Sequence, residues 1–76
     1  MKVSKVNLER IKQLRKKNKL SQEEMAKLLG MKSLYPYHRK ERGEQSFTAE
    51  ELHSIAKIFI VPVEYFFEIE VAKNAI

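Results

Sequence analysis

Aromatic and basic side chains are concentrated in one short stretch, residues 32–42. Tyrosine, histidine and arginine can hydrogen-bond the exposed edges of bases, and lysine and arginine neutralise phosphates. On a helix, the polar positions of this stretch are Tyr35, His38, Arg39, Lys40 and Arg42. These residue types indicate recognition of a polyanion.

Catalytic and metal-binding chemistry is poorly supported by the rest of the chain. None of the serines has a convincing histidine and acid partner, and there is no glycine-rich phosphate loop. There is no cysteine, and His38 and His53 lie far apart in the sequence, so a metal site is not expected. We therefore expect no enzyme activity and no cofactor.

Two short helices joined by a tight turn are expected to position the basic stretch. Ser21 and Glu24 form the S-x-x-E pattern of a capping box, which predicts a helix starting at Gln22 and ending at Gly30. A second helix is predicted from Ser33 to Arg42. Such a pair matches a helix-turn-helix, whose second helix enters the major groove of DNA.

The N-terminal part predicts a basic arm followed by one helix. Residues 1–6 are expected to form a loose arm. Asn7 is a plausible cap for a helix that runs to about Asn18. Arg15 falls on the buried side of that helix, where a charge requires a partner.

The C-terminal part predicts two more helices and a strand-like tail. Thr48 and Glu51 form a second capping box, which opens a fourth helix. Pro62 is expected to open a short fifth helix through about Phe67. The alternation of apolar and acidic residues over 67–71 has the period of a strand, although this run could also fold back as a last turn.

The length and charge of the chain suit one small domain. Its 76 residues are expected to form a single all-α unit, with a core at about 7–67 and a C-terminal tail at 68–76. Residues 1–20 carry eight Lys or Arg and one Glu, a net charge of +7, whereas residues 46–76 carry −3. No stretch resembles a signal peptide or a membrane span, so we expect a cytoplasmic protein with no membrane contact.

Several motifs in register resemble the phage repressor and Cro proteins, the XRE-like helix-turn-helix regulators. The resemblance covers roughly residues 7–67 and is carried by residues 22–30, by Tyr37-x-x-x-Glu41-Arg42-Gly43, by Leu52-x-x-Ile55-Ala56 and by residues 61–67. It implies a compact five-helix repressor-type domain with a short C-terminal extension. It also implies binding of operator DNA, usually as a symmetric dimer, with the third helix in the major groove.

The resemblance assigns roles to individual residues. Leu34, Tyr35 and Arg39 fall at base-contacting positions, and Arg15 with Glu41 matches an ion bridge within the domain. Gln22 would contact a phosphate and brace the recognition helix. The full set of residues implied to bind DNA is Gln22, Lys32, Ser33, Leu34, Tyr35, His38, Arg39, Arg42 and Gln45.

The chain departs from the family pattern at two places. One extra residue lies between Gly30 and Gly43, near residues 32–35, and it shifts which side chains face the groove. Ile60 stands where relatives commonly carry glycine. A left-handed backbone there would be strained for a β-branched side chain, and otherwise the helix must end differently.

Three classes of function follow from these observations. The first is a transcriptional repressor of phage or mobile-element type that reads an inverted-repeat operator. The second is an antitoxin that represses its own operon, with residues 69–76 as the surface for a toxin partner. The third is a protein-interaction module without DNA. An excess of apolar residues over 60–71 predicts homodimerisation through the C-terminal region.

Overall fold

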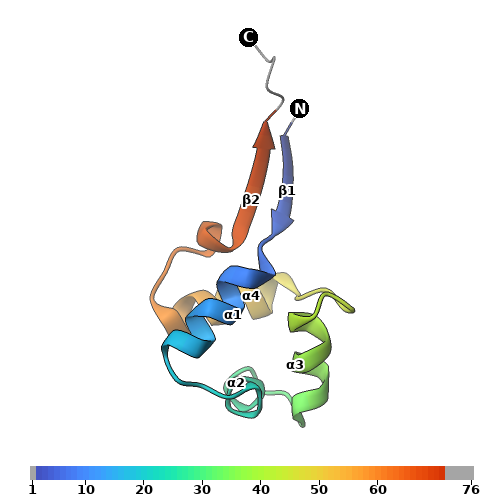
Figure 1. Cartoon of the computed structure of the whole chain (residues 1–76), viewed down its shortest axis with the longest axis vertical. Coiled ribbons are helices and arrows are strands. Elements are labelled where there is room, and N and C mark those ends of the chain that lie inside the picture. The colour runs from blue at the N-terminus through green and yellow to red at the C-terminus, as the bar shows by residue number, and fades with distance from the viewer. Residues whose placement is uncertain (1, 72–76) are drawn as a thin grey trace.

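A computed structural model of the chain describes residues 2–71. It contains four α-helices, one 3-10 turn and a two-stranded sheet (Figure 1). None of the described helices is long and apolar enough to cross a membrane. In chain order the elements are β1 (Lys2–Val6), α1 (Leu8–Lys17), α2 (Gln22–Leu28), α3 (Leu34–Glu41), α4 (Ala49–Phe59), η1 (Val63–Phe66) and β2 (Phe67–Val71).

The helix starts lie where the capping residues predicted them. The Ser21 hydroxyl accepts from the Glu24 backbone N–H at 3.0 Å, and the Glu24 carboxylate accepts from the Ser21 backbone N–H at 2.8 Å. Thr48 and Glu51 repeat this arrangement at the start of α4. The side chain of Asn7 caps α1. Each cap satisfies backbone donors that a short helix would otherwise leave without partners.

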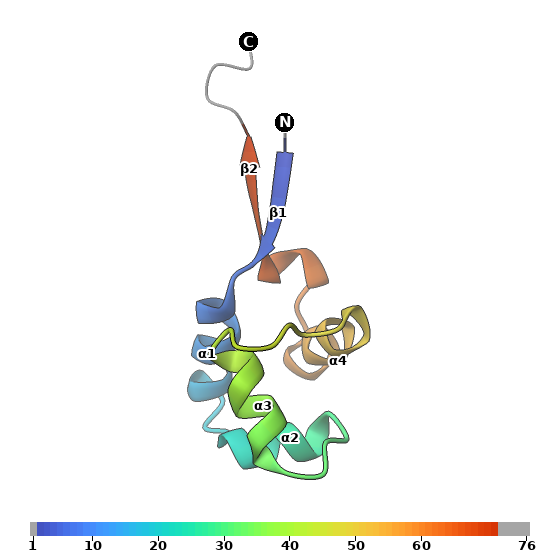
Figure 2. The same cartoon turned by 90° about the vertical axis from the view of Figure 1, so that its right-hand side faces the viewer.

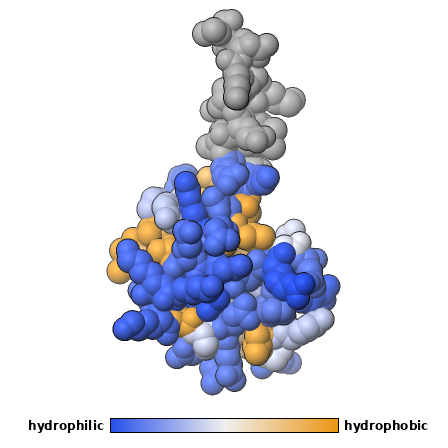
Figure 3. Space-filling view, in the orientation of Figure 1, coloured by the Kyte–Doolittle hydropathy of each residue, from blue (hydrophilic) through white to orange (hydrophobic). Residues whose placement is uncertain are grey.

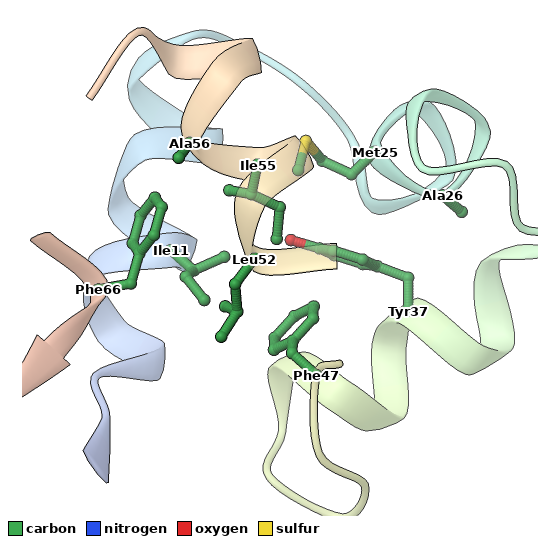
Figure 4. Close-up of a cluster of buried hydrophobic side chains, with 9 residues drawn as sticks. All are labelled: Ile11, Met25, Ala26, Tyr37, Phe47, Leu52, Ile55, Ala56 and Phe66. Atoms are coloured by element: carbon green, nitrogen blue, oxygen red, sulfur yellow. The ribbon is translucent and has the colours of Figure 1, made fainter. Parts of the chain in front are cut away.

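The core is a single cluster to which all four helices contribute (Figure 4). Tyr37 packs edge-on against Phe47, with 5.9 Å between the ring centroids. Tyr37, Phe47 and Phe66 are buried, so their rings belong to the core and are not available to stack on bases. The cluster consists of Ile11, Met25, Ala26, Tyr37, Phe47, Leu52, Ile55, Ala56 and Phe66.

The expected fifth helix is wrong, because residues 63–66 form only a 3-10 turn. Pro62 stands immediately before the turn and cannot donate a backbone hydrogen bond. The backbone is already extended at Phe67, where β2 begins, so only four residues remain between the two. This is too short for a stable α-helix. The expected mostly helical domain therefore has four helices rather than five, together with a small two-stranded sheet.

The expected loose N-terminal arm is also wrong. Residues 2–6 form β1, which pairs antiparallel with β2 from Val6 opposite Phe67 to Lys2 opposite Val71. Of the two possibilities left open for residues 67–71, the structure shows the strand, which pairs with the N-terminal strand of its own chain. Of the tail considered for a toxin partner, residues 69–71 lie in β2, and residues 72–76 are outside the described part.

The β1–β2 ladder extends from the helical body at the end opposite to α2 and α3 (Figures 1 and 2). Asn7 makes two hydrogen bonds at the end of the ladder that joins the helical body. The backbone N–H of Asn7 donates to the Phe66 carbonyl at 2.7 Å, and its side-chain amide donates to the Glu68 carboxylate at 2.8 Å. The sheet therefore leaves the helix pair uncovered.

Ile60 ends α4 in the left-handed conformation, with φ 56° and ψ 52°. The sequence left two possibilities at this residue, and the structure shows the strained one. The side chain is also 89% exposed. A β-branched residue therefore occupies a backbone conformation that favours glycine, without gaining burial in return.

Candidate nucleic-acid interface

Helix α3 has one face in the core and one face in solvent. Tyr37, Lys40 and Glu41 are buried on the inner face. The opposite stripe is exposed or half-buried, and its members recur with the spacing of helix turns. They are Leu34, Tyr35, His38, Arg39 and Arg42. The extra residue near residues 32–35 left open which side chains face outward. In the structure these five do.

A buried ion pair fixes the inner face of α3 against α1. Arg15 donates from Nε to Glu41 Oε2 at 2.8 Å and from Nη2 to Glu41 Oε1 at 3.1 Å. Its remaining terminal nitrogen donates to the Leu20 carbonyl at 2.8 Å. The bridge implied by the family resemblance is confirmed, and it satisfies an arginine that the helix pattern placed in the core.

Two further side chains donate to the same carboxylate. Tyr37 Oη donates to Glu41 Oε2 at 2.6 Å, and Gln22 Nε2 donates to Glu41 Oε1 at 2.9 Å. Burial alone would raise the pKa of Glu41, but the hydrogen bonds from Arg15, Tyr37 and Gln22 lower it below its ordinary value. Burial and the neighbouring carboxylate raise the pKa of Tyr37, so its hydroxyl stays protonated and donates.

Gln22 links this buried group to the outer face of α3. Its amide oxygen lies 3.0 Å from Nδ1 of His38, on the stripe that faces solvent. The bracing role expected for Gln22 therefore has a specific basis in Glu41 and His38. One N–H of its amide makes none of these bonds and is available for an outside acceptor such as a phosphate.

The sequence placed Lys40 among the polar positions of α3, and this is wrong. Its side chain is buried, and Nζ donates to both carboxylate oxygens of Glu51 at 2.7 Å. Glu51 also accepts from the Thr48 backbone, so it caps α4 and joins α4 to α3. The available signal was helical spacing, because Lys40 follows Tyr37 by three residues and shares its inward side.

The outward stripe combines an apolar hollow with a basic end. Gln22, Leu34, Tyr35 and His38 line an open hollow at the junction of α2 and α3. Next to it the Arg39 guanidinium lies 5.7 Å from the centroid of the Tyr35 ring. The stripe therefore offers apolar surface, hydrogen-bonding groups and positive charge side by side.

Glu44 lies beside the two arginines at the basic end of the outward stripe. Its carboxylate lies 3.2 Å from Arg42 Nε and 3.7 Å from Arg39 Nε. All three side chains are partly exposed to solvent, so these contacts are weak. Both guanidinium groups therefore remain able to reach an external anion.

The other three predicted DNA-contacting residues lie at the ends of α3. Lys32 and Ser33 precede the helix and are exposed, and the Ser33 side chain makes no capping hydrogen bond. Gln45 is exposed beyond the helix but belongs to a different hollow, lined also by Val6 and Phe47. The structure thus brings eight of the nine residues to α3, to its two ends or, for Gln22, to the adjoining start of α2, and it places Gln45 apart.

A family model described as helix-turn-helix matches residues 11–35 of this chain. The chain is also similar to an uncharacterized transcriptional regulator in the ATPase CF(0) region of Rhodospirillum rubrum, with 37% identity over 59 residues. Both comparisons support the XRE-like helix-turn-helix family. The alignment with the Rhodospirillum rubrum protein covers 78% of this chain and 54% of the relative, so the chain spans about half of that protein's length.

The family match ends at Tyr35, at the start of α3. Most of the outward stripe of this domain therefore lies beyond the matched residues. The face of the molecule seen in Figure 3 is mainly hydrophilic, with small hydrophobic patches between the polar side chains. Within residues 2–71 no group of three or more His, Asp or Glu side chains is placed to hold a metal ion.

Proposed function

We propose that this chain is a DNA-binding transcriptional regulator that reads a duplex with α3 in the major groove. The observation that carries the proposal is the division of α3 into two faces. The inner face is held by the buried Arg15–Glu41 pair, and the outer face offers Tyr35, His38 and Arg39 to solvent. A rigid helix with outward hydrogen-bonding groups is what major-groove readout requires. The name of the Rhodospirillum rubrum relative supports the same conclusion.

The outward side chains suit different parts of the DNA, some the base edges and others the phosphates. Arg39 can pair with O6 and N7 of guanine, and Leu34 can cover the methyl group of thymine. Tyr35, which is 63% exposed, can donate to a base or a phosphate. Phosphate contacts would come from the side chains at the ends of the helix pair, namely Gln22, Lys32, Ser33, Arg42 and Gln45.

The test is selection of bound duplexes from a random pool, followed by two matched substitutions. Arg39→Ala should weaken the selected sequence by about 1–3 kcal/mol and relax the preference at one base position. Arg42→Ala should weaken selected and random DNA alike, because it removes a phosphate contact. Equal losses on both DNAs for Arg39→Ala would exclude the base-reading role, and failure to enrich any sequence would exclude specific binding.

We also propose that the regulator acts as a homodimer and repressor on an inverted-repeat operator. Ile60 is exposed and strained, and it lines an open, mostly apolar hollow whose other residues are His53, Ala56, Lys57, Val61, Pro62 and Val63. A protruding apolar side chain next to an apolar hollow suits a two-fold contact, in which each copy fills the hollow of the other. Two recognition helices would then lie ~34 Å apart, one turn of DNA, and occupation of that operator would exclude other proteins.

Sedimentation equilibrium of three chains tests the dimer. The unmodified chain should be dimeric and Ile60→Asn should be monomeric with the fold retained, since asparagine tolerates left-handed backbone. Leu28→Gln is the matched control, because Leu28 is an exposed apolar residue on α2 outside this patch. An unmodified chain that stays monomeric at high micromolar concentration would contradict the proposal.

A further inference from the structure

A chain of hydrogen bonds runs from the core to the outer face of α3. It begins at Arg15, passes through the Glu41 carboxylate to the Gln22 amide, and ends at the His38 ring. Residues from α1, α2 and α3 contribute to it. It therefore connects a buried ion pair to a side chain on the face proposed to meet DNA.

The direction of each bond in this chain is fixed by chemistry. The Glu41 carboxylate can only accept, so the group that Gln22 turns toward it must be the amide NH₂. The amide oxygen of Gln22 then faces His38, and an oxygen can only accept. Nδ1 of His38 must therefore carry a hydrogen to make the 3.0 Å contact.

The other ring nitrogen of His38 then has a defined role. In a neutral imidazole only one nitrogen carries hydrogen, so Nε2 is left as an acceptor. Within residues 2–71 Nε2 makes no recorded hydrogen bond and is not among the buried atoms that lack a partner. His38 lines the open hollow with Leu34 and Tyr35, one helical turn beyond Leu34. Nε2 is therefore an accessible acceptor on the outward stripe.

We propose that His38 is a specificity-determining residue whose Nε2 accepts a hydrogen bond from an amino group of a base, N6 of adenine or N4 of cytosine. Those amino groups are the donors that the major groove exposes. Gln22 is the positioning residue, because its amide holds the tautomer that presents the acceptor. The inference rests on the proposed function, since it concerns which base α3 selects. It adds His38 to the residues proposed to contact base edges, which are Leu34, Tyr35 and Arg39.

The tautomer can be measured without DNA. In protein labelled with ¹⁵N-histidine, at a pH of about 8.5 where histidine rings are ordinarily neutral, the nitrogen shifts distinguish a protonated from a bare ring nitrogen. His38 should have hydrogen on Nδ1 and none on Nε2, and Gln22→Met should abolish this preference while the domain stays folded. A His38 ring with its hydrogen on Nε2 in the unmodified chain would overturn the proposal. His53, exposed on α4, serves as the internal comparison.

Base preference is the second readout. On the selected duplex, His38→Ala should remove the preference for an amino-bearing base at one position and weaken binding about threefold to tenfold, the contribution of one hydrogen bond. Gln22→Met should weaken the base preference at the same position of the duplex, and His53→Ala should leave that preference unchanged. Replacement of that adenine by purine, or that cytosine by a base without the amino group, should weaken the unmodified chain but not His38→Ala.

The two proposals fail in different ways. If the unmodified chain enriches no duplex, the proposed function is wrong, and the tautomer measurement still reports on the Gln22–His38 contact. If the chain enriches a sequence but His38→Ala selects the same bases, the role of His38 alone is wrong. A preference that moves to guanine or is lost uniformly across positions would likewise exclude the amino-group contact.

Discussion

Arg15 on α1 and Glu41 on α3, which are 26 residues apart in the chain, are joined by two hydrogen bonds at 2.8 and 3.1 Å. Both side chains are almost completely buried. This pair sets how α3 sits on α1, and it leaves the opposite side of α3 facing solvent. The DNA contacts proposed for the outer face of α3 therefore depend on how the inner face of α3 is packed.

Glu41→Gln should lower the free energy of unfolding by roughly 3–5 kcal/mol. The substitution leaves the Arg15 charge buried without its counter-ion and puts an amide NH₂ near other donors. Glu44→Gln is the matched control, because Glu44 makes only accessible contacts with arginines and should change stability little. Urea unfolding of the three chains measures the difference, and equal midpoints would show that the buried pair does not stabilise the domain.

The same pair predicts how stability depends on pH. The pKa of Glu41 is lower in the folded chain than its ordinary value of 4.5. Its contribution to stability is therefore complete above pH 4.5 and is lost as the pH falls through the lowered folded pKa. The pKa of Glu51 is lowered too, because the bonds from Lys40 and Thr48 outweigh the effect of burial, so it adds to the same acid loss.

Unfolding free energies measured between about pH 6 and pH 2 check this expectation. The unmodified chain should lose stability steeply in the acid range, and Glu41→Gln should lose less over the same interval because one titrating carboxylate is gone. Glu44→Gln should follow the unmodified chain. Parallel curves for Glu41→Gln and the unmodified chain would mean that Glu41 is not held as a carboxylate by the fold.

The helix starts and the buried bridge could be predicted because they are local or carried by a family pattern. Ser21, Thr48 and Asn7 each act within three residues of their own helix, so the sequence alone specifies them. The Arg15–Glu41 pair came from the family resemblance, since nothing in the spacing relates two residues so far apart. The candidate DNA-contacting residues were named from the same source.

The parts that the sequence did not reveal depend on contacts between distant segments. Residues 2–6 mix two lysines and a serine with two valines, and they form a strand because β2 offers them an edge more than 60 residues away. Lys40 is buried because its ammonium group pairs with Glu51. The sequence explained Glu51 by its capping of α4, so it gave no reason to expect a second partner for this residue. The contact of Gln22 with His38 follows from the packing of α2 on α3, which no local pattern describes.

Ile60→Gly and Ile60→Asn should both stabilise the monomer. Left-handed backbone costs an ordinary L-residue about 1–2 kcal/mol, and the exposed side chain gains little in compensation. Asparagine should give the clearer gain of about 1 kcal/mol, because glycine also raises the entropy of the unfolded chain. Thermal unfolding at concentrations where the chain is monomeric measures the effect. A lower melting temperature for Ile60→Asn would mean that Ile60 makes stabilising contacts within its own monomer.

Glu44→Gln should strengthen binding to all duplexes without changing sequence preference. The carboxylate lies near Arg39 and Arg42 and offsets their charge at the DNA-facing end of α3. Its removal should raise the affinity for DNA and leave the preferred bases unchanged, because Glu44 is not among the residues proposed to contact a base. Glu64→Gln, on η1, is the matched charge control and should have a smaller effect. A changed base preference for Glu44→Gln would show that Glu44 positions the base-reading arginine.

A map of the DNA-contacting surface tests most directly whether α3 reads DNA. Amide chemical shifts of ¹⁵N-labelled protein are followed as the selected duplex is added at low salt, where electrostatic binding is strongest. We predict the largest changes at Gln22 and over residues 32–42, and small changes in η1 and the β1–β2 ladder, which lies at the opposite end of the domain. No shifts on addition of duplex, or shifts confined to the ladder and η1, would contradict the assignment of α3 as the element that reads DNA.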